Sequence, residues 1–276
     1  MRMMYLAAAA ALVFAASADA ATTSTGWQST IQYSTTATAA SGFRNGTRIT
    51  TSVIYDPATD TYTLRDTGSP TLTSSFGPTN IDVVASDAAF TVYKKVSGST
   101  TETLRLLNQG AGNPLIVLSY VDYGQWRRAT TASGTTNIND TYVVFGTKTA
   151  RADMPHSGTG SYNTILDGTF VNKTGNYAVS GTGTFTADFA AGSISYSSVA
   201  NATPETIGTA FSFGTLTGTG SIAFNSSSFR GTGATNGSGY SMGVNGGFYG
   251  PGAAEIGGVF TLKGNGGNGT GAIVGN

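Results

Sequence analysis

The chain has no cysteine and only one histidine among its 276 residues. A disulfide framework, a thiolate nucleophile and a zinc site built from cysteine and histidine are therefore excluded. Charge is also sparse, because 14 basic and 14 acidic side chains make up 10% of the chain and no basic run occurs. Nucleic acid is not indicated as a partner, since its binding depends on clustered lysine and arginine.

No stretch approaches the roughly 20 consecutive apolar residues that a transmembrane helix needs. A shorter apolar run, residues 6–16, lies between Arg2 and the small-x-small sequence Ala18-Asp19-Ala20. This order of positive charge, short apolar run and cleavage site is typical of a secretory signal. We expect residues 1–20 to be removed and the mature chain, from about Ala21, to be exported without a transmembrane segment.

Glycine is abundant and unevenly distributed. Eleven of the 39 glycines lie in residues 1–150, and 28 lie in residues 151–276. Charged side chains are concentrated instead in the first half. Two domains that meet near Ala150, residues 21–150 and residues 151–276, are the simplest explanation of this change in composition.

The first half has the period of β-strands. Val53 and Tyr55 alternate with polar residues, Asp56-Pro57-Ala58-Thr59-Asp60 predicts a turn, and Tyr62 and Leu64 resume the alternation. This pattern predicts a hairpin.

The rest of the first half continues in the same way. Residues 101–126 predict two further strands around a Gly-Asn-Pro loop. Residues 76–92 have no clear period and fit either a short helix or an irregular crossing. Because no longer window holds a helical period, we expect an antiparallel β domain.

In the second half, Gly-Thr-Gly recurs and often precedes a clean alternation. Phe185, Ala187 and Phe189 are expected to share one face of a strand, and so are Ile222 and Phe224. Repeated glycine in strands marks bends, bulges or close backbone approach. About eight short strands of this kind predict a small closed antiparallel barrel, which has no exposed sheet edge. The fold class is therefore all-β.

Two short enzyme motifs lack their structural context. Gly239-Tyr240-Ser241-Met242-Gly243 matches the G-x-S-x-G of serine hydrolases, but neither a helix nor a histidine follows it. Gly264-Asn265-Gly266-Gly267-Asn268-Gly269 matches G-x-G-x-x-G without a helix to present to a phosphate, so it predicts a turn. The few acidic residues of the second half are not clustered. We assign no catalytic residue and no metal site, and we expect that the protein is not an enzyme.

Three segments carry a family resemblance: YGQWRR (Tyr123 to Arg128), FGTKTARADMPHSGTGSY (Phe145 to Tyr162) and GGFYGPGAAEIGGVFTL (Gly246 to Leu262). They resemble the transferrin-binding protein B-like, solute-binding β-barrel family, and the last two segments are the most specific. In that family, Met-Pro-x-Ser-Gly-Thr opens the barrel. Phe-Tyr-Gly-Pro, with a glutamate and paired glycines, lies in its last hairpins.

The resemblance covers most of the mature chain and implies a handle-like β domain followed by one barrel. It implies an exported binding protein of a Gram-negative bacterium that acquires haem or iron or contacts a host protein. An outer-membrane receptor or an exporter would be a further partner.

Two features depart from the family. Ala20-Ala21 stands where lipidated members have a cysteine, so we expect a secreted, periplasmic or surface-associated protein without a lipid anchor. The chain has room for one lobe, resembling the secreted haem-capturing haemophilins, whereas transferrin receptors of the family have two.

The candidate ligand residues are His156, Trp126, Arg127 and Arg128. Imidazole is an established axial ligand of haem iron, and the arginines would pair with its propionates. All four lie near the expected domain boundary in sequence, and ligands favour inter-domain clefts. The alternative for His156 is a surface or hinge residue, and the family motif assigns it no role. No cofactor is required, and the ligand would be haem, another small hydrophobic solute or a host protein.

A second hypothesis is a structural or adhesive β-rich surface module without a small-molecule ligand. Sequence rich in glycine, threonine and serine is also common in such modules. A chromophore that copurifies with the protein favours the first hypothesis, whereas self-association without any small ligand favours the second.

The intact mass of the exported protein tests the expected N-terminus. It should correspond to a chain that begins near Ala21 and carries no acyl group, because the cleavage pattern ends at Ala20 and no cysteine is available for a lipid. A mass that includes residues 1–20, or an acyl adduct, would contradict this expectation.

Overall fold

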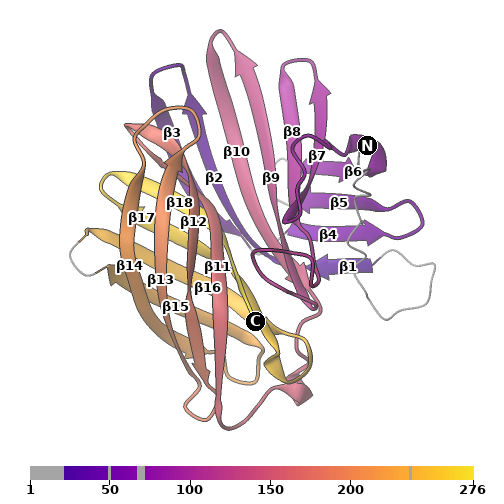
Figure 1. Cartoon of the computed structure of the whole chain (residues 1–276), viewed down its shortest axis with the longest axis vertical. Helices are drawn as coiled ribbons and strands as arrows, with labels where there is room; N and C mark the ends of the chain where they lie inside the picture. The colour runs from indigo at the N-terminus through magenta and orange to yellow at the C-terminus, as the bar shows by residue number, and fades with distance from the viewer. Residues whose placement is uncertain (1–21, 49–50, 67–71, 236–237) are drawn as a thin grey trace, which may run out of the picture.

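The computed structural model describes residues 22–48, 51–66, 72–235 and 238–276 (Figure 1). The expected signal, residues 1–20, and the cleavage site before Ala21 lie outside these residues. Over the described ranges, the helices are three short 3-10 turns: η1 (Pro78–Asn80), η2 (Arg151–Asp153) and η3 (Pro251–Ala253). None of the helices in this part of the chain has the length and apolarity that a membrane crossing requires.

The described strands form two open antiparallel sheets and one closed antiparallel barrel. The four-stranded sheet has the order β1 (Thr22–Thr25), β4 (Thr51–Asp56), β5 (Thr61–Asp66), β6 (Leu72–Phe76). The six-stranded sheet has the order β3 (Ala40–Arg48), β2 (Trp27–Thr35), β10 (Thr135–Gly146), β9 (Val121–Ala132), β8 (Thr100–Leu107), β7 (Phe90–Ser97). The barrel closes in sequence order through β11 (Thr159–Asn172), β12 (Gly175–Asp188), β13 (Ser193–Pro204), β14 (Phe211–Ile222), β15 (Ser228–Thr235), β16 (Tyr240–Tyr249), β17 (Glu255–Gly264) and β18 (Gly267–Gly275).

The six-stranded sheet is the middle layer of the molecule, between the four-stranded sheet and the barrel (Figure 1). We call the two open sheets together the handle. On one face of the middle layer, Trp126 and Leu104 pack in one apolar cluster with Val53, Leu64 and Phe76 of the four-stranded sheet. The handle is therefore a sandwich over part of its length, and it buries its apolar rows between the two sheets.

The opposite face of the middle layer packs on the outside of the barrel. Val121, Tyr123 and Val144 share an apolar cluster with Val259 and Val274 of β17 and β18. A Cβ atom added to Gly257 would overlap the side chains of Val121 and Val144. Glycine at this position therefore permits the close approach of the handle to the barrel wall.

Aromatic rings fill the interior of the barrel. The ring centroids of Phe185 and Phe229 are 4.7 Å apart, and those of Phe170 and Phe213 are 5.1 Å apart in an edge-to-face arrangement. These side chains belong to one buried cluster that draws on the barrel strands. The barrel is thus a packed core, and ligand sites have to be sought on its rim or its outer surface.

The all-β fold with a closed eight-stranded antiparallel barrel confirms the expected fold class. The barrel strands are longer than expected, since they run from 8 residues in β15 to 14 residues in β11. Several Gly-Thr-Gly repeats lie inside these strands rather than at bends. Gly218 pairs with Gly233 across β14 and β15, and the ring of Tyr196 covers Gly218. The missing side chains make room for neighbouring backbone and rings.

The local predictions for the first half are also confirmed. The expected hairpin is β4 and β5, and the Asp56 carboxylate accepts the Ala58 amide at 3.0 Å in its turn. Residues 101–126 contain β8 and the start of β9, and the unclear stretch 76–92 contains η1.

One prediction for the second half is wrong. Ile222 ends β14, but Phe224 lies in the following turn, with 92% of its surface exposed, and shares no strand face with Ile222.

A buried carboxyl group in the handle provides a test of this packing. Asp122 of β9 is 3% exposed, and no ion pair with a described residue neutralises it. Burial raises the pKa of Asp122 well above its ordinary value, although the Tyr123 amide donates to its Oδ1 at 2.7 Å. The pKa of Asp122 is therefore higher in the folded chain than in the unfolded chain. The protonated carboxyl favours the folded state at acid pH, and this contribution to the free energy of unfolding declines as pH rises from the unfolded pKa to the folded pKa.

We expect Asp122→Asn to remove this decline. The variant should unfold at a higher temperature than the wild type at pH 7, whereas the two should converge near pH 4. The difference should grow by about 1.4 kcal/mol for each pH unit between the two pKa values. Thermal unfolding followed by circular dichroism across this pH range measures it. A variant that is destabilised more at pH 7 than at pH 4 would show that Asp122 is ionised in the folded protein.

Candidate functional site

Two segments that are far apart in sequence meet where the handle joins the barrel. The Thr149 amide donates to the Phe248 carbonyl at 2.9 Å, and the Gly250 amide donates to the Thr147 carbonyl at 2.9 Å. The Thr149 hydroxyl donates to the Gly250 carbonyl at 2.7 Å. Both segments belong to the motifs that carry the family resemblance, so these motifs build the connection between the two parts.

The carboxylate of Glu255 holds a handle loop against the barrel. Glu255 opens β17 and is 5% exposed. Its Oε1 accepts the Ser119 amide at 2.7 Å, and its Oε2 accepts the amides of Tyr120 and Val121 at 2.9 Å each. Three charge-assisted hydrogen bonds thus fix the end of the β8–β9 loop where β9 begins. The sequence motif contained this glutamate, but only the fold shows its role.

A second buried carboxylate, on β10, connects the handle to the barrel further along the six-stranded sheet. Asp140 is fully buried and accepts the Nη2 of Arg127 at 2.6 Å and the Thr169 hydroxyl of β11 at 2.7 Å. The same Nη2 of Arg127 also donates to Glu205 at 2.7 Å. Burial opposes the charge of Arg127, but these carboxylates outweigh it and keep its pKa above the ordinary value.

A third group of this kind lies at Asp167 of β11. The guanidinium of Arg105 pairs with Asp167, and the Tyr123 hydroxyl donates to the same carboxylate at 2.8 Å. The guanidinium carbon of Arg105 also lies 4.2 Å from the centroid of the Phe90 ring. Charged groups of the handle are therefore neutralised by the barrel wall, and the handle and barrel form one packed unit.

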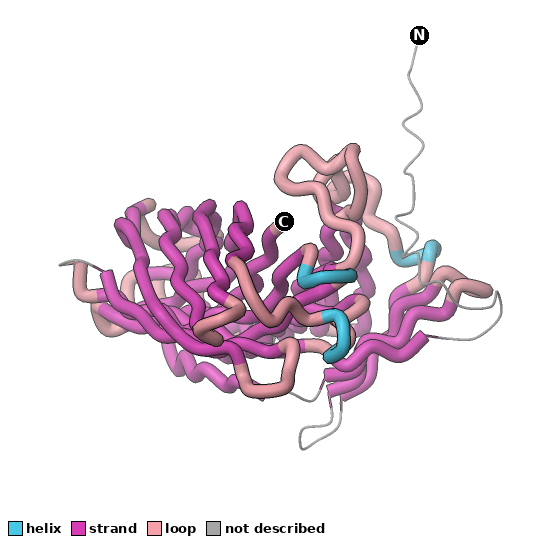
Figure 2. The backbone as a smooth tube through the Cα atoms, turned by 90° about the horizontal axis from the view of Figure 1, so that it is seen from below, coloured by secondary structure: helices cyan, strands magenta, loops and turns pink. Residues whose placement is uncertain are grey.

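The loops beyond this connection border an open cavity of about 890 Å³ on the rim of the barrel, at the end where β11 begins. Figure 2 views the molecule from this end. We call this cavity the rim cavity. Its lining residues come from the η2 segment and from the β12–β13 and β14–β15 turns. They include Met154, His156, Phe189, Ile222 and Phe224. This size falls within the range of small-molecule sites.

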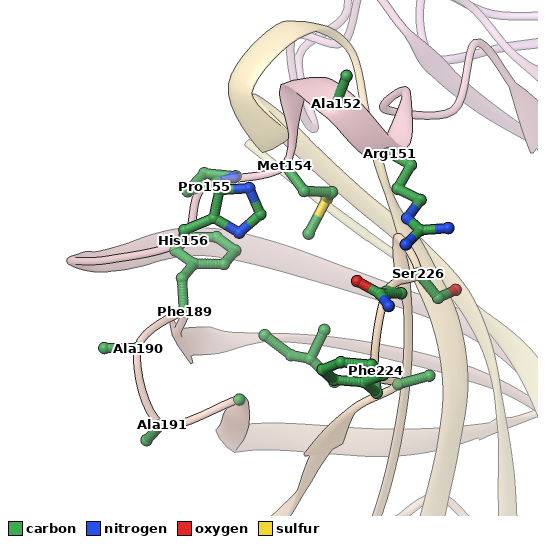
Figure 3. A pocket seen from close by; sticks show the side chains of 14 residues that line it. Arg151, Ala152, Met154, Pro155, His156, Phe189, Ala190, Ala191, Phe224 and Ser226 are labelled. Atoms are coloured by element: carbon green, nitrogen blue, oxygen red, sulfur yellow. The ribbon is translucent and has the colours of Figure 1, made fainter.

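The rim cavity combines an apolar wall with two polar groups that have no partner among the residues that the structure describes. Figure 3 shows Met154 between His156 and Arg151, with Phe189 and Phe224 below them in this view. The side chains of His156 and Arg151 are exposed and make no hydrogen bond or ion pair to a described residue. None of the described lining residues is acidic. The cavity therefore offers a cation and an imidazole to a ligand with an apolar body.

The four sequence-predicted ligand residues lie in different places. His156 lines the rim cavity, at the start of β11, whereas Arg127 contacts residues near the opposite end of that strand. Trp126 is 5% exposed and lies between the two handle sheets. Arg128 is on the same side of the middle layer as Trp126 and pairs with Glu102 at 3.4 Å. No single cleft contains all four, and whether each binds a ligand stays a prediction.

Sequence reasoning missed most of the rim cavity. Arg151, Phe189 and Phe224 line it beside His156, although segments far apart in sequence contribute them. The one usable signal was Phe224, a large apolar residue directly before the turn-forming sequence Asn-Ser-Ser. In the part of the chain that the structure describes, no group of three or more histidine and acidic side chains is placed to hold a metal ion.

A scan against models of known protein families finds no match, and neither does a comparison with curated protein sequences. Solved structures do show a likeness. A transferrin-binding protein B mutant from Haemophilus parasuis aligns with a TM-score of 0.49 and 17% identity over 90% of this chain and 45% of that one. Transferrin-binding protein B from Neisseria meningitidis aligns with a TM-score of 0.45 and 17% identity over 90% of this chain and 43% of that one.

An isolated lobe aligns over nearly its full length. The N-lobe of lactoferrin-binding protein B from Moraxella bovis matches with a TM-score of 0.41 and 12% identity, covering 90% of this chain and 99% of that one. The chain therefore spans less than half the length of each of these two transferrin-binding proteins and nearly the whole length of the isolated lobe. At these identities and TM-scores, the likeness by itself assigns neither a family nor a ligand.

Glu255→Ala tests the connection between handle and barrel. The variant leaves the amides of Ser119, Tyr120 and Val121 without an acceptor, so we expect the free energy of unfolding to fall by about 3 kcal/mol. Asp153→Ala is the control, because Asp153 is exposed and has no side-chain partner among the described residues, and it should change stability by less than about 0.5 kcal/mol. Urea unfolding measures both. Equal midpoints for Glu255→Ala and the wild type would contradict the proposed role.

Proposed function

We propose that this chain is an exported, non-catalytic binding protein that captures a small apolar anion in the rim cavity, with haem as the first candidate. One observation carries the proposal: a cavity of about 890 Å³ with an apolar wall that also contains the chain's single histidine and an arginine that pairs with none of the described residues. Sites for small ligands combine such apolar walls with a few polar groups that orient the ligand.

The roles of the lining residues follow from their chemistry. The His156 imidazole would bind the iron of haem, because imidazole is its commonest protein donor. Arg151 would pair with a carboxylate in a charge-assisted hydrogen bond. Phe189, Phe224 and Ile222 would cover the apolar body and exclude water.

In this proposal Arg151 takes the role expected for Arg127 and Arg128. Neither of those side chains lines the rim cavity: Arg127 pairs with Asp140 and Glu205, and Arg128 lies on the outer face of the handle beside Glu102. Haem or iron acquisition by a Gram-negative bacterium would place the protein in the periplasm, at the cell surface or in the medium. An outer-membrane receptor or an exporter would then be its partner.

A host protein as the ligand is the second candidate, and it rests on a different observation. The β8–β9 loop, whose end Glu255 fixes at this end of the barrel, exposes Leu115 by 51%, Val117 by 44% and Tyr120 by 36%. Exposed apolar side chains in a group are typical of protein interaction sites. The similar solved structures are described as binding proteins for transferrin and lactoferrin, and for this chain such a partner belongs to the proposal.

Titration with haem, followed by absorbance, tests the first candidate. The wild type should give a saturable Soret change. His156→Ala should shift the band and weaken binding by about tenfold or more, and Arg151→Gln should weaken it without moving the band, because it removes a charge and not an iron ligand.

Ser241→Ala is the control, since Ser241 is exposed on β16 and does not line the rim cavity. It should change neither the affinity nor the spectrum. A wild-type protein without a saturable change would reject haem and favour a protein ligand at this end. A His156→Ala variant with an unchanged spectrum would show that another residue binds the iron.

A further inference from the structure

The outer face of the six-stranded sheet, which points away from the barrel, contains two polar rows that run across five strands. The strand register places Gln32, Asn139, Arg128, Glu102 and Lys95 side by side in one row. The next row, nearer the free ends of the hairpins, consists of Ser34, Asn137, Thr130, Thr100 and Ser97. Cross-strand neighbours of this kind are close enough to act on one ligand together.

Among the described residues, nothing covers most of these two rows, because the four-stranded sheet is shorter than its partner. The next row toward the barrel end of the sheet contains Trp126, Leu104 and Tyr93, and it is buried under the four-stranded sheet. At the polar rows, contact with that sheet is limited to one side, where Ser74 donates to Glu102 and Lys95 donates to Ser74 and to the Ser75 carbonyl.

Two hollows lie along the polar rows, and Arg128 lines both of them. One has about 410 Å³ and is lined by Gln32, Ser34, Thr130, Asn137 and Asn139, among others. The other has about 680 Å³ and is lined by Lys94, Lys95, Thr100 and Glu102, among others. Together they form a polar trough across five strands, which at the spacing of neighbouring strands is about 19 Å long.

The chemistry of the polar trough is that of hydrogen bonding rather than apolar burial. Amides, hydroxyls and a guanidinium lie along it. The Nε of Arg128 faces Glu102 at 3.4 Å, but the side chain is 40% exposed and its two terminal nitrogens make no hydrogen bond to a described residue. A ligand hydroxyl both donates and accepts, so one hydroxyl can serve an acceptor and a donor on neighbouring strands. Two cationic side chains of the polar rows, Lys95 and Arg128, outnumber the one carboxylate, Glu102, which both of them contact.

We infer that the polar trough is a second binding site and that it takes an oligosaccharide carrying a carboxylate. An elongated ligand with many hydroxyls matches the two rows, and its carboxylate would pair with the guanidinium of Arg128 at the middle of the trough. Because the trough lies on the side of the handle opposite the barrel, this site is independent of the rim cavity and of its ligand.

Nuclear magnetic resonance titration of the whole protein with 3′-sialyllactose and with lactose tests the inference. Sialyllactose should shift the amide signals of the two polar rows in a saturable way, and lactose, which lacks the carboxylate, should bind about tenfold more weakly or not at all. Arg128→Gln should remove this preference for the acidic sugar. Asn137→Ala, at an exposed position, should weaken binding of both sugars.

Asn201→Ala provides the matched control, because Asn201 is an exposed strand asparagine on the outside of the barrel. It should bind sialyllactose like the wild type. Thermal unfolding confirms that each variant is folded. If neither sugar shifts the polar rows, or if Asn137→Ala and Arg128→Gln both bind like the wild type, the trough is a solvated sheet face and the inference is wrong.

Discussion

The carboxylate of Glu255 and the three backbone amides that it accepts determine how the handle sits on the barrel. A buried carboxylate is costly unless it is fully hydrogen-bonded, so this contact permits only one position of the β8–β9 loop. The adjacent pairing of Thr149 with Phe248 and Gly250 extends the same connection. Asp140 and Asp167 repeat the principle further along the interface, where handle arginines reach carboxylates shared with the barrel.

The interface that fixes the handle on the barrel also positions the residues of the rim cavity. The segment that leaves the connection at Thr149 continues directly into η2, Met154 and His156, so its position at the barrel rim is set by the interface rather than by a flexible linker. The rim cavity is therefore formed in advance, with Arg151 and His156 held opposite the turns that carry Phe189 and Phe224. Preformed sites avoid the entropic cost of ordering loops when a ligand binds.

The sequence predicted the architecture better than the sites. Alternation and turn chemistry located the hairpin at Asp56 and the barrel strands, because local patterns determine strands and turns. The family motifs also contained Glu255. The role of Glu255 depends on contacts with residues more than one hundred positions away in the sequence, and no local pattern reveals such contacts. Trp126, Arg127 and Arg128 are adjacent in sequence but point to alternate faces of β9, so a strand separated residues that the sequence suggested as one group.

Phe224 is a case in which the local pattern itself predicted the wrong environment. Its spacing from Ile222 predicted a shared buried face, but β14 ends at Ile222 and the turn directs the ring outward. The strand boundary, which is the least predictable feature of a strand, here decides whether a residue belongs to the core or to the candidate site. The polar rows of the outer handle face escaped the sequence for a similar reason, because register across five strands cannot be read from any one of them.

The central claim is that handle and barrel form one unit connected through Glu255, and amide hydrogen exchange tests it directly. If the claim holds, the amides of Ser119, Tyr120 and Val121 exchange as slowly as those of β17, because they open only when the barrel wall opens. Fast exchange of these three amides, with β17 still protected, would show that the loop opens independently of the barrel and would contradict the account.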